Sequence, residues 1–285
     1  MKYVLSRLGN NTDARFCTAG AVIGDIVLKG TREWATHNAN CYIGCSHGCI
    51  YCYARANAAR FNLRKPSDWG RMTPSIMASK TFGKKDGVVM FPTSHDITPD
   101  TLGFSSAFLK KILKPGNSVL IVSKPHLSCI RYLCETFAPF KDKVLFRFSI
   151  GTLQPDVSLF WEPEAPLPEE RIVALSHAYE SGFSTSVSIE PMLDQNVDDV
   201  ISAVTPYVTE KIWIGKMNLV TARLRINGFA DKIKHPYVQD LIDFTCADDF
   251  ILSLGARHGD NEHIRWKDSI QQVLDDRKES ELENA

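Results

Sequence analysis

The sequence has no long apolar run and no apolar stretch at its N-terminus. None of its hydrophobic segments approaches the roughly 18 residues that a membrane-spanning helix needs, so we expect no membrane span. The first residues, Met1–Leu8, lack the apolar core of a signal peptide. The chain contains eight cysteines, which stay reduced and free to bind metal in a reducing compartment. We therefore expect a cytoplasmic protein.

The sequence also lacks net charge, short repeats and linker-like segments. Its 33 lysines and arginines balance 33 acidic residues, so bulk charge does not make it a binder of polyanions. A chain of 285 residues, 44% of them hydrophobic, is long enough to form one large core. Because no segment rich in proline, glycine or serine divides it, we expect one domain with short appendages, and a monomer.

One segment departs from the balanced charge. Residues 55–85 contain eight basic side chains and a single acidic residue, Asp68. Such a run is usually a solvated surface. The alternative is a surface that follows the phosphates of a nucleic acid, with Trp69 and Phe82 available for stacking on bases. The sequence leaves both interpretations open.

Cys45, Cys49 and Cys52 are the most informative residues of the chain. Three thiolates at this spacing can hold three irons of a [4Fe–4S] cluster and leave the fourth iron open, whereas an electron-transfer cluster uses four cysteines. An open iron indicates chemistry on a bound molecule. With Cys41 the chain could alternatively form a closed zinc site. Zinc sites, however, usually pair two separated cysteine hooks, which this crowded segment does not offer.

The string Gly44-Cys-Ser-His-Gly-Cys-Ile-Tyr-Cys-Tyr-Ala-Arg55 resembles the cluster loop of radical S-adenosylmethionine (SAM) enzymes. Within that superfamily it is similar to the branch of spore photoproduct lyase and the DNA repair photolyase-like proteins. The resemblance implies a [4Fe–4S] cluster and SAM as cofactors, reductive cleavage of SAM to a 5′-deoxyadenosyl radical, and an electron donor such as flavodoxin or ferredoxin. It places Tyr51 and Tyr53 among the catalytic residues, and Tyr51 also beside the cofactor.

Short β-branched runs alternate with longer amphipathic ones, which is typical of a parallel α/β fold. Strands are expected just before Cys41 and at 87–92, 118–123, 144–150, 184–189 and 211–214. Helices are expected at 53–63, 101–113, 128–137, 168–181 and 197–205. These six βα units, over residues 36–245, resemble the partial (β/α)6 TIM-type barrel of the radical SAM core. Residues 1–35 would form an N-terminal cap, and residues 246–285 a C-terminal helical extension with a frayed tail.

Polar residues follow the second expected strand, at the end where a barrel of this kind has its site. Many radical SAM enzymes have a Gly-Gly-Glu segment here, but this chain has Ser94, His95 and Asp96. These resemble the Thr-Ser-Asp stretch of the lyase branch, which implies contacts to the ammonium group of SAM. The alternative is that Asp96 and Thr98 cap the helix that begins near Pro99.

Three further residues lie at the ends of later strands. A lysine such as Lys124 is costly to bury without an anion, and the resemblance supplies the carboxylate of SAM; the alternative is a solvent-facing loop lysine. Ser149 resembles a ribose-binding residue of the superfamily. Glu190 would hydrogen-bond the ribose or orient Lys124, or alternatively form a structural salt bridge.

The sequence differs from spore photoproduct lyase at the residue that donates hydrogen in the lyase. Spore photoproduct lyase has a cysteine just before its Thr-Ser-Asp stretch, and the position aligned on Asp96 is Thr93 in this chain. Cys129, or alternatively Cys134, is a candidate hydrogen-atom relay by proximity in the sequence alone. We therefore expect a radical SAM enzyme other than the lyase, acting on a nucleic acid or nucleotide, or alternatively on a peptide or small metabolite. A metal-stabilised nucleic-acid-binding module without catalysis is the alternative of a different class.

Overall fold

A computed structural model describes residues 22–23, 26–27 and 30–283. Its main sheet has seven strands in the order β11-β10-β9-β8-β7-β6-β3, and all neighbouring pairs are parallel. These strands are β3 (His37–Asn38), β6 (Val88–Phe91), β7 (Ser118–Ser123), β8 (Val144–Ser149), β9 (Ser184–Ile189), β10 (Ile212–Ile214) and β11 (Ile264–Trp266). Two antiparallel pairs stand apart from it: β1 (Val22–Ile23) with β2 (Ile26–Val27), and β4 (Tyr42–Ile43) with β5 (Thr73–Pro74).

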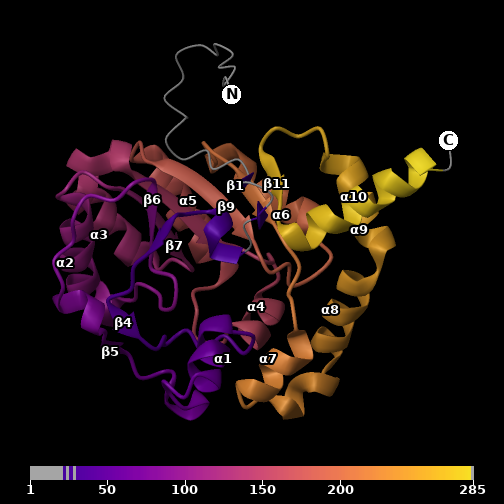
Figure 1. Cartoon of the computed structure of the whole chain (residues 1–285), viewed down its shortest axis with the longest axis horizontal. Helices are drawn as coiled ribbons and strands as arrows, with labels where there is room; N and C mark the ends of the chain where they lie inside the picture. Colours follow the sequence, from indigo (N-terminus) through magenta and orange to yellow (C-terminus); the bar gives the residue numbers. More distant parts are fainter. Residues whose placement is uncertain (1–21, 24–25, 28–29, 284–285) are drawn as a thin grey trace.

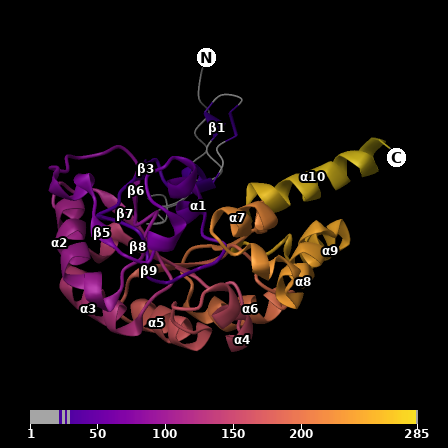
Figure 2. The ribbon, with the colours of Figure 1, turned by 90° about the horizontal axis from the view of Figure 1, so that it is seen from below.

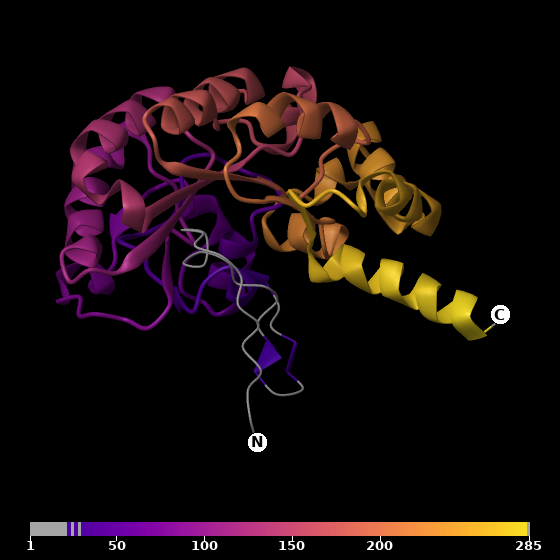
Figure 3. The same ribbon diagram turned by 90° about the horizontal axis from the view of Figure 1, so that it is seen from above.

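Helices cover the outer side of the sheet in an arc that runs from α2 through α3 and α5 to α6, which Figures 2 and 3 show from opposite sides. The α-helices are α1 (Tyr53–Arg60), α2 (Leu102–Leu113), α3 (Leu127–Phe137), α4 (Pro155–Trp161), α5 (Pro168–Glu180), α6 (Val197–Val204), α7 (Val220–Ile226), α8 (Pro236–Cys246), α9 (Asp248–His258) and α10 (Asp268–Glu283). In Figure 1, α1 and α7 lie side by side at the lower edge of the molecule.

Within the described residues the sheet is not closed, because β3 and β11 are its two edge strands. The prediction of an α/β partial barrel of the TIM type is therefore confirmed. One strand was missed: β11 pairs with β10 through Ile212 and Ile264, and it comes from the segment predicted to be a helical extension. The C-terminal segment ends in α10, whose backbone is helical to Glu283, and the expected fraying of the tail stays a prediction.

The strands are buried on both faces, as parallel strands between helices and a filled interior must be. Every residue of β6 is buried, and apolar side chains of the sheet and the helices form one continuous core. The interior also holds a buried cation, Arg147, whose guanidinium lies 4.8 Å from the ring centre of Trp34 and 5.2 Å from that of Trp213. Burial lowers the pKa of Arg147 to about 9. Arg147 thus lines the barrel interior, where aromatic rings surround it.

Candidate cofactor and active site

A cavity of about 520 Å³ opens at the carboxyl ends of the strands, between the cysteine loop, α1 and α7. Eleven of the twelve residues predicted for the site line it: Cys45, Cys49, Tyr51, Cys52, Tyr53, Ser94, His95, Asp96, Lys124, Ser149 and Glu190. The exception is Cys129, which is 1% exposed in α3 and packs in the hydrophobic core. The structure therefore brings together what the strand-end argument predicted, but it gives Cys129 no access to the cavity.

The segment that follows α1 packs against the outer side of the cysteine loop and is hydrogen-bonded to it. The backbone N–H of Cys45 donates to the carbonyl of Trp69 at 2.9 Å. Gly44 has a φ of +99°, and a Cβ there would lie 2.6 Å from the same carbonyl oxygen. Glycine is therefore required at this position for the cysteine loop and the segment after α1 to approach each other. Cys52 caps α1, since its Sγ accepts the backbone N–H of Arg55 at 3.4 Å.

The three cysteines suit a metal cluster better than they suit isolated thiolates. All are free, and burial together with their mutual charge raises the pKa of Cys45 well above its usual value and that of Cys49 to about 12. A cluster would supply the positive charge that such thiolates need. No three His, Cys, Asp or Glu side chains of the described residues converge on a single ion. In a [4Fe–4S] cube, each cysteine ligates a different iron.

Cys41 is placed apart from these three. It is fully buried and is absent from the lining of the cavity. Its backbone N–H donates to Nε2 of His95 at 3.1 Å, and its Sγ lies 3.6 Å from the same nitrogen. His95 therefore supports the segment before the cysteine loop, with its other ring nitrogen 3.1 Å from the carbonyl of Asp96. Burial lowers the pKa of His95, which favours the neutral ring.

Asp96 joins the cysteine loop to the ends of two strands. Its Oδ2 accepts the backbone N–H of Lys124 at 2.8 Å and lies 3.3 Å from Nδ1 of His47, and its Oδ1 accepts the hydroxyl of Ser123. Burial alone would raise the pKa of Asp96, but the charge of His47 and these hydrogen bonds lower it to about 2. Of the two residues expected to cap the following helix, Thr98 does so, in a capping box with Thr101, and Asp96 does not.

Lys124 has a protein carboxylate as a partner, which the sequence did not reveal. Its Nζ lies 3.6 Å from Oε1 of Glu162, a residue that is 2% exposed just after α4. Glu162 also binds Arg171 at 2.6 Å and accepts the hydroxyl of Tyr51. Two cations thus share one carboxylate, so these three side chains together carry a net positive charge beside the cavity. The pKa of Lys124 is well above its usual value, because its interactions with Tyr51, Cys49 and Glu162 outweigh the effect of burial.

One version of the prediction had Glu190 orient Lys124, but the salt-bridge partner of Glu190 among the described residues is a different lysine. Its Oε2 lies 3.8 Å from Nζ of Lys267, a buried lysine just after the unpredicted strand β11. Lys267 in turn binds Glu33 at 2.8 Å and the carbonyl of Gly30 at 3.0 Å. The structural salt bridge, which was the alternative, is therefore present. Burial raises the pKa of Glu190, and Lys267 only partly offsets this effect.

The remaining predicted residues lie between these groups. Tyr53 faces the cavity, and its hydroxyl donates to the carbonyl of Thr93. Although Tyr53 is 42% exposed, desolvation within the cavity raises the pKa of its hydroxyl, so the phenol is protonated at neutral pH. Asn40 accepts the backbone N–H groups of Thr93 and Ser94 at 2.8 and 2.9 Å. The carbonyl of Ser149 accepts from Arg171 at 3.1 Å, while the residue itself lines the cavity.

Helix α7 forms the opposite wall, and no sequence argument pointed to it. Asn227, at its end, is fully buried and donates from Nδ2 to the carbonyls of Ile50 at 2.9 Å and Cys52 at 3.0 Å. Lys216 and Arg223 line the cavity from this side. Within the described residues, the side chains of these two cations have no hydrogen bond or salt bridge, in contrast to Lys124.

The basic segment 55–85 differs from the surface that the nucleic-acid alternative assumed. Trp69 is 4% exposed and packs on α1 and on Cys45 and Cys52, so it is not available for stacking. Phe82 is half-buried against Phe108. Arg64 donates to the carbonyls of Ile43 and Arg71, which uses its guanidinium inside the protein.

No family model matches the sequence. An uncharacterized protein of Acidianus two-tailed virus is 28% identical over 176 residues, which cover 57% of each chain. An uncharacterized protein of Methanocaldococcus jannaschii is 26% identical over 195 residues, or 66% of this chain and 73% of the other. The structure of spore photoproduct lyase complexed with dinucleoside spore photoproduct matches 69% of this chain and 61% of its own, with a TM-score of 0.50 and 12% identity.

This chain therefore has the fold of spore photoproduct lyase, and the resemblance predicted from the cysteine loop is confirmed for the fold. The chain spans less than two thirds of the length of both the viral protein and the lyase. No helix of the described residues is both long and apolar enough to cross a membrane.

Proposed function

We propose that this protein is a radical SAM enzyme whose [4Fe–4S] cluster is held by Cys45, Cys49 and Cys52. The observation that carries the proposal is the meeting of three free cysteines with Lys124 and Asp96 around one cavity at the strand ends. When bound, the cluster and SAM would supply a 5′-deoxyadenosyl radical, which abstracts hydrogen from a substrate. The residues of the chain bind, orient and shield these groups.

Lys124 would hold the carboxylate of SAM. Its ammonium shares Glu162 with Arg171, so it retains a positive charge that an incoming carboxylate neutralises. Asp96 would fix this lysine, because it binds the Lys124 backbone and His47 of the cysteine loop with one carboxylate. The same bonds consume both oxygens of Asp96. The ammonium of SAM would therefore meet Ser94 and nearby carbonyls, and Ser149 and Glu190 would face the ribose.

The substrate that suits the opposite wall is an anion. Lys216 and Arg223 line the cavity, and neither side chain has a hydrogen bond or salt bridge among the described residues. Burial lowers the pKa of Arg223, and the nearby carboxyl of Glu190 only partly offsets this effect. A guanidinium with unused donors matches phosphate or carboxylate oxygens. This charge favours a nucleotide or nucleic acid over a neutral peptide or metabolite, and it makes α7 the substrate-binding wall. Tyr53, whose phenol is protonated and faces the cavity, is the catalytic side chain nearest to this region.

Anaerobic reconstitution tests the proposal. The protein should take up about four irons per chain and, with dithionite as reductant, convert SAM to 5′-deoxyadenosine and methionine. Stoichiometric zinc without iron uptake would contradict it, and so would an iron-loaded protein that leaves SAM intact.

A further inference from the structure

The basic segment after α1 lies directly on the outer side of the cysteine loop. Trp69 packs against Ala54 and Ala58 of α1 and against Cys45 and Cys52. Its carbonyl accepts the N–H of Cys45 at 2.9 Å. Gly44 leaves no room for a side chain between the loop and this segment. Trp69 thus belongs to a small buried cluster against which two of the proposed cluster ligands pack.

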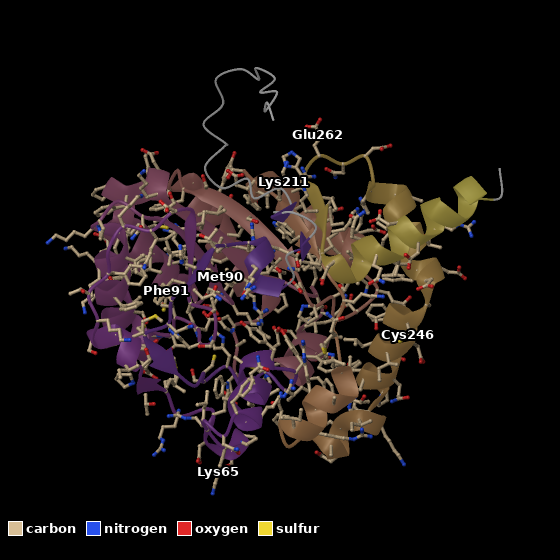
Figure 4. All side chains as sticks on the ribbon, in the orientation of Figure 1. Lys65, Met90, Phe91, Lys211, Cys246 and Glu262 are labelled. Carbon is tan, nitrogen blue, oxygen red and sulfur yellow. The ribbon has the colours of Figure 1, made fainter. Side chains whose placement is uncertain are left out.

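The surface above Trp69 combines exposed apolar and basic side chains. Phe61 is 65% exposed and Leu63 is 73% exposed, although both are large and hydrophobic. The cations Lys65 and Arg71 are exposed beside them, and Lys65 projects from the lower edge of the molecule in Figure 4. Asp68 is the one acidic residue of this stretch. We call these four residues, Phe61, Leu63, Lys65 and Arg71, the outer patch.

We infer that the outer patch is the docking surface for an acidic one-electron carrier protein. This inference rests on the proposed function, because a radical SAM enzyme must receive an electron. Apolar side chains surrounded by cations suit an acidic protein partner, in which charge steers the encounter and the apolar centre fixes it. A nucleic acid fits less well, because Trp69 is buried and Phe61 is the single aromatic ring among the four residues of the outer patch, so successive bases would lack a stacking platform. Because Trp69 lies between this surface and the cysteine loop, an electron would reach the cluster from the outer patch rather than from the outer helical arc.

The test uses the reconstituted holoenzyme and a reduced, acidic flavodoxin as the probe. Lys65→Glu/Arg71→Glu should slow cluster reduction by flavodoxin about 10-fold or more at low salt and flatten its salt dependence. Reduction by dithionite, which needs no docking, should be unchanged. Phe61→Ser/Leu63→Ser should slow reduction at all salt concentrations. The matched control, Lys110→Glu/Lys114→Glu, reverses two exposed lysines at the far end of α2 and should behave as wild type.

Equal rates for the patch variant and the control would overturn the inference. Loss of salt-dependent binding of a single-stranded oligonucleotide in the patch variant, with flavodoxin kinetics unchanged, would assign the surface to nucleic acid instead. Failure of the proposed function is distinguishable, because the wild-type protein would then show no iron cluster that dithionite can reduce.

Discussion

The two walls of the cavity differ in how their charges are compensated. On the cysteine side, Asp96 is bound by His47 and two strand ends, and Lys124 is bound by Glu162. On the α7 side, the side chains of Lys216 and Arg223 have no hydrogen bond or salt bridge among the described residues, although the charge of Glu190 attracts Arg223. A wall whose groups are fixed before any ligand arrives is suited to cofactors that are always the same. A wall with unused cationic donors is suited to an anion that enters and leaves.

The largest effect expected on the cysteine wall comes from Cys45→Ala. The variant should lose the brown chromophore or retain a degraded cluster after anaerobic reconstitution, because two cysteines cannot hold the cube. Cys41→Ala is the matched control, since Cys41 is buried against His95 outside the cavity. Its iron content should stay near that of wild type. Equal iron loss in both variants would mean that Cys41 is a ligand.

Lys124→Ala should weaken SAM binding by roughly 2–4 kcal/mol, or on the order of 30- to 1000-fold, because a charge-assisted bond in a poorly solvated site is lost. Equilibrium dialysis of the reconstituted protein measures this, with iron content as an internal check. Lys114→Ala, an exposed lysine after α2, serves as the control. Unchanged affinity in Lys124→Ala would mean that this wall binds SAM without its lysine.

Asp96→Asn should destabilise the protein in a pH-dependent way. The folded-state pKa of Asp96 is lowered from 3.8 to about 2, which corresponds to about 2 kcal/mol. This stabilisation is fully present above pH 4 and is lost as the pH falls towards 2. Urea unfolding of the metal-free protein should therefore show a deficit at pH 7 that narrows below pH 4. Asp68→Asn, at an exposed position, should show no deficit, and a deficit independent of pH would refute the role of the charge.

The smallest effect is expected on the α7 wall. Arg223→Ala should weaken binding of a nucleoside 5′-monophosphate to the SAM-loaded protein about 10-fold, which matches the loss of about 1.5 kcal/mol for one charge-assisted bond. Arg225→Ala removes an exposed arginine from the same helix and should have no effect. If neither variant changes the affinity, or if the wild-type protein does not bind the nucleotide, the α7 wall is not the binding surface for an anionic substrate.

The fold was predictable because parallel strands are buried on both faces. The runs Ser118–Ser123 and Ser184–Ile189 were predicted with the bounds of β7 and β9, and, apart from Leu120, both consist of small or β-branched residues. Strand β11 was missed because its three residues include an exposed arginine, Arg265, and show no apolar run. Helix α4 was missed because it has only seven residues, Pro155–Trp161.

The site was predictable where a residue belongs to the motif or directly follows a strand. Three site residues were not predicted, because they reach the site from helix ends and a late strand and no local sequence pattern marks them: Glu162, Asn227 and Lys267. Asn227, for example, binds the carbonyl of Ile50 across 177 residues of sequence. Only the lysine carried a usable signal, since it follows a strand end as Lys124 does, and that strand was not recognised.

The central claim is that the cysteine wall holds an iron cluster whose open iron binds SAM. Electron paramagnetic resonance of the reconstituted, dithionite-reduced protein tests this most directly, with and without SAM. We expect the spectrum of a reduced [4Fe–4S] cluster whose g-values shift when SAM is added, and the same shift to need a much higher SAM concentration in Lys124→Ala. A cluster spectrum that SAM leaves unchanged, or a protein with zinc and no cluster signal, would contradict the claim.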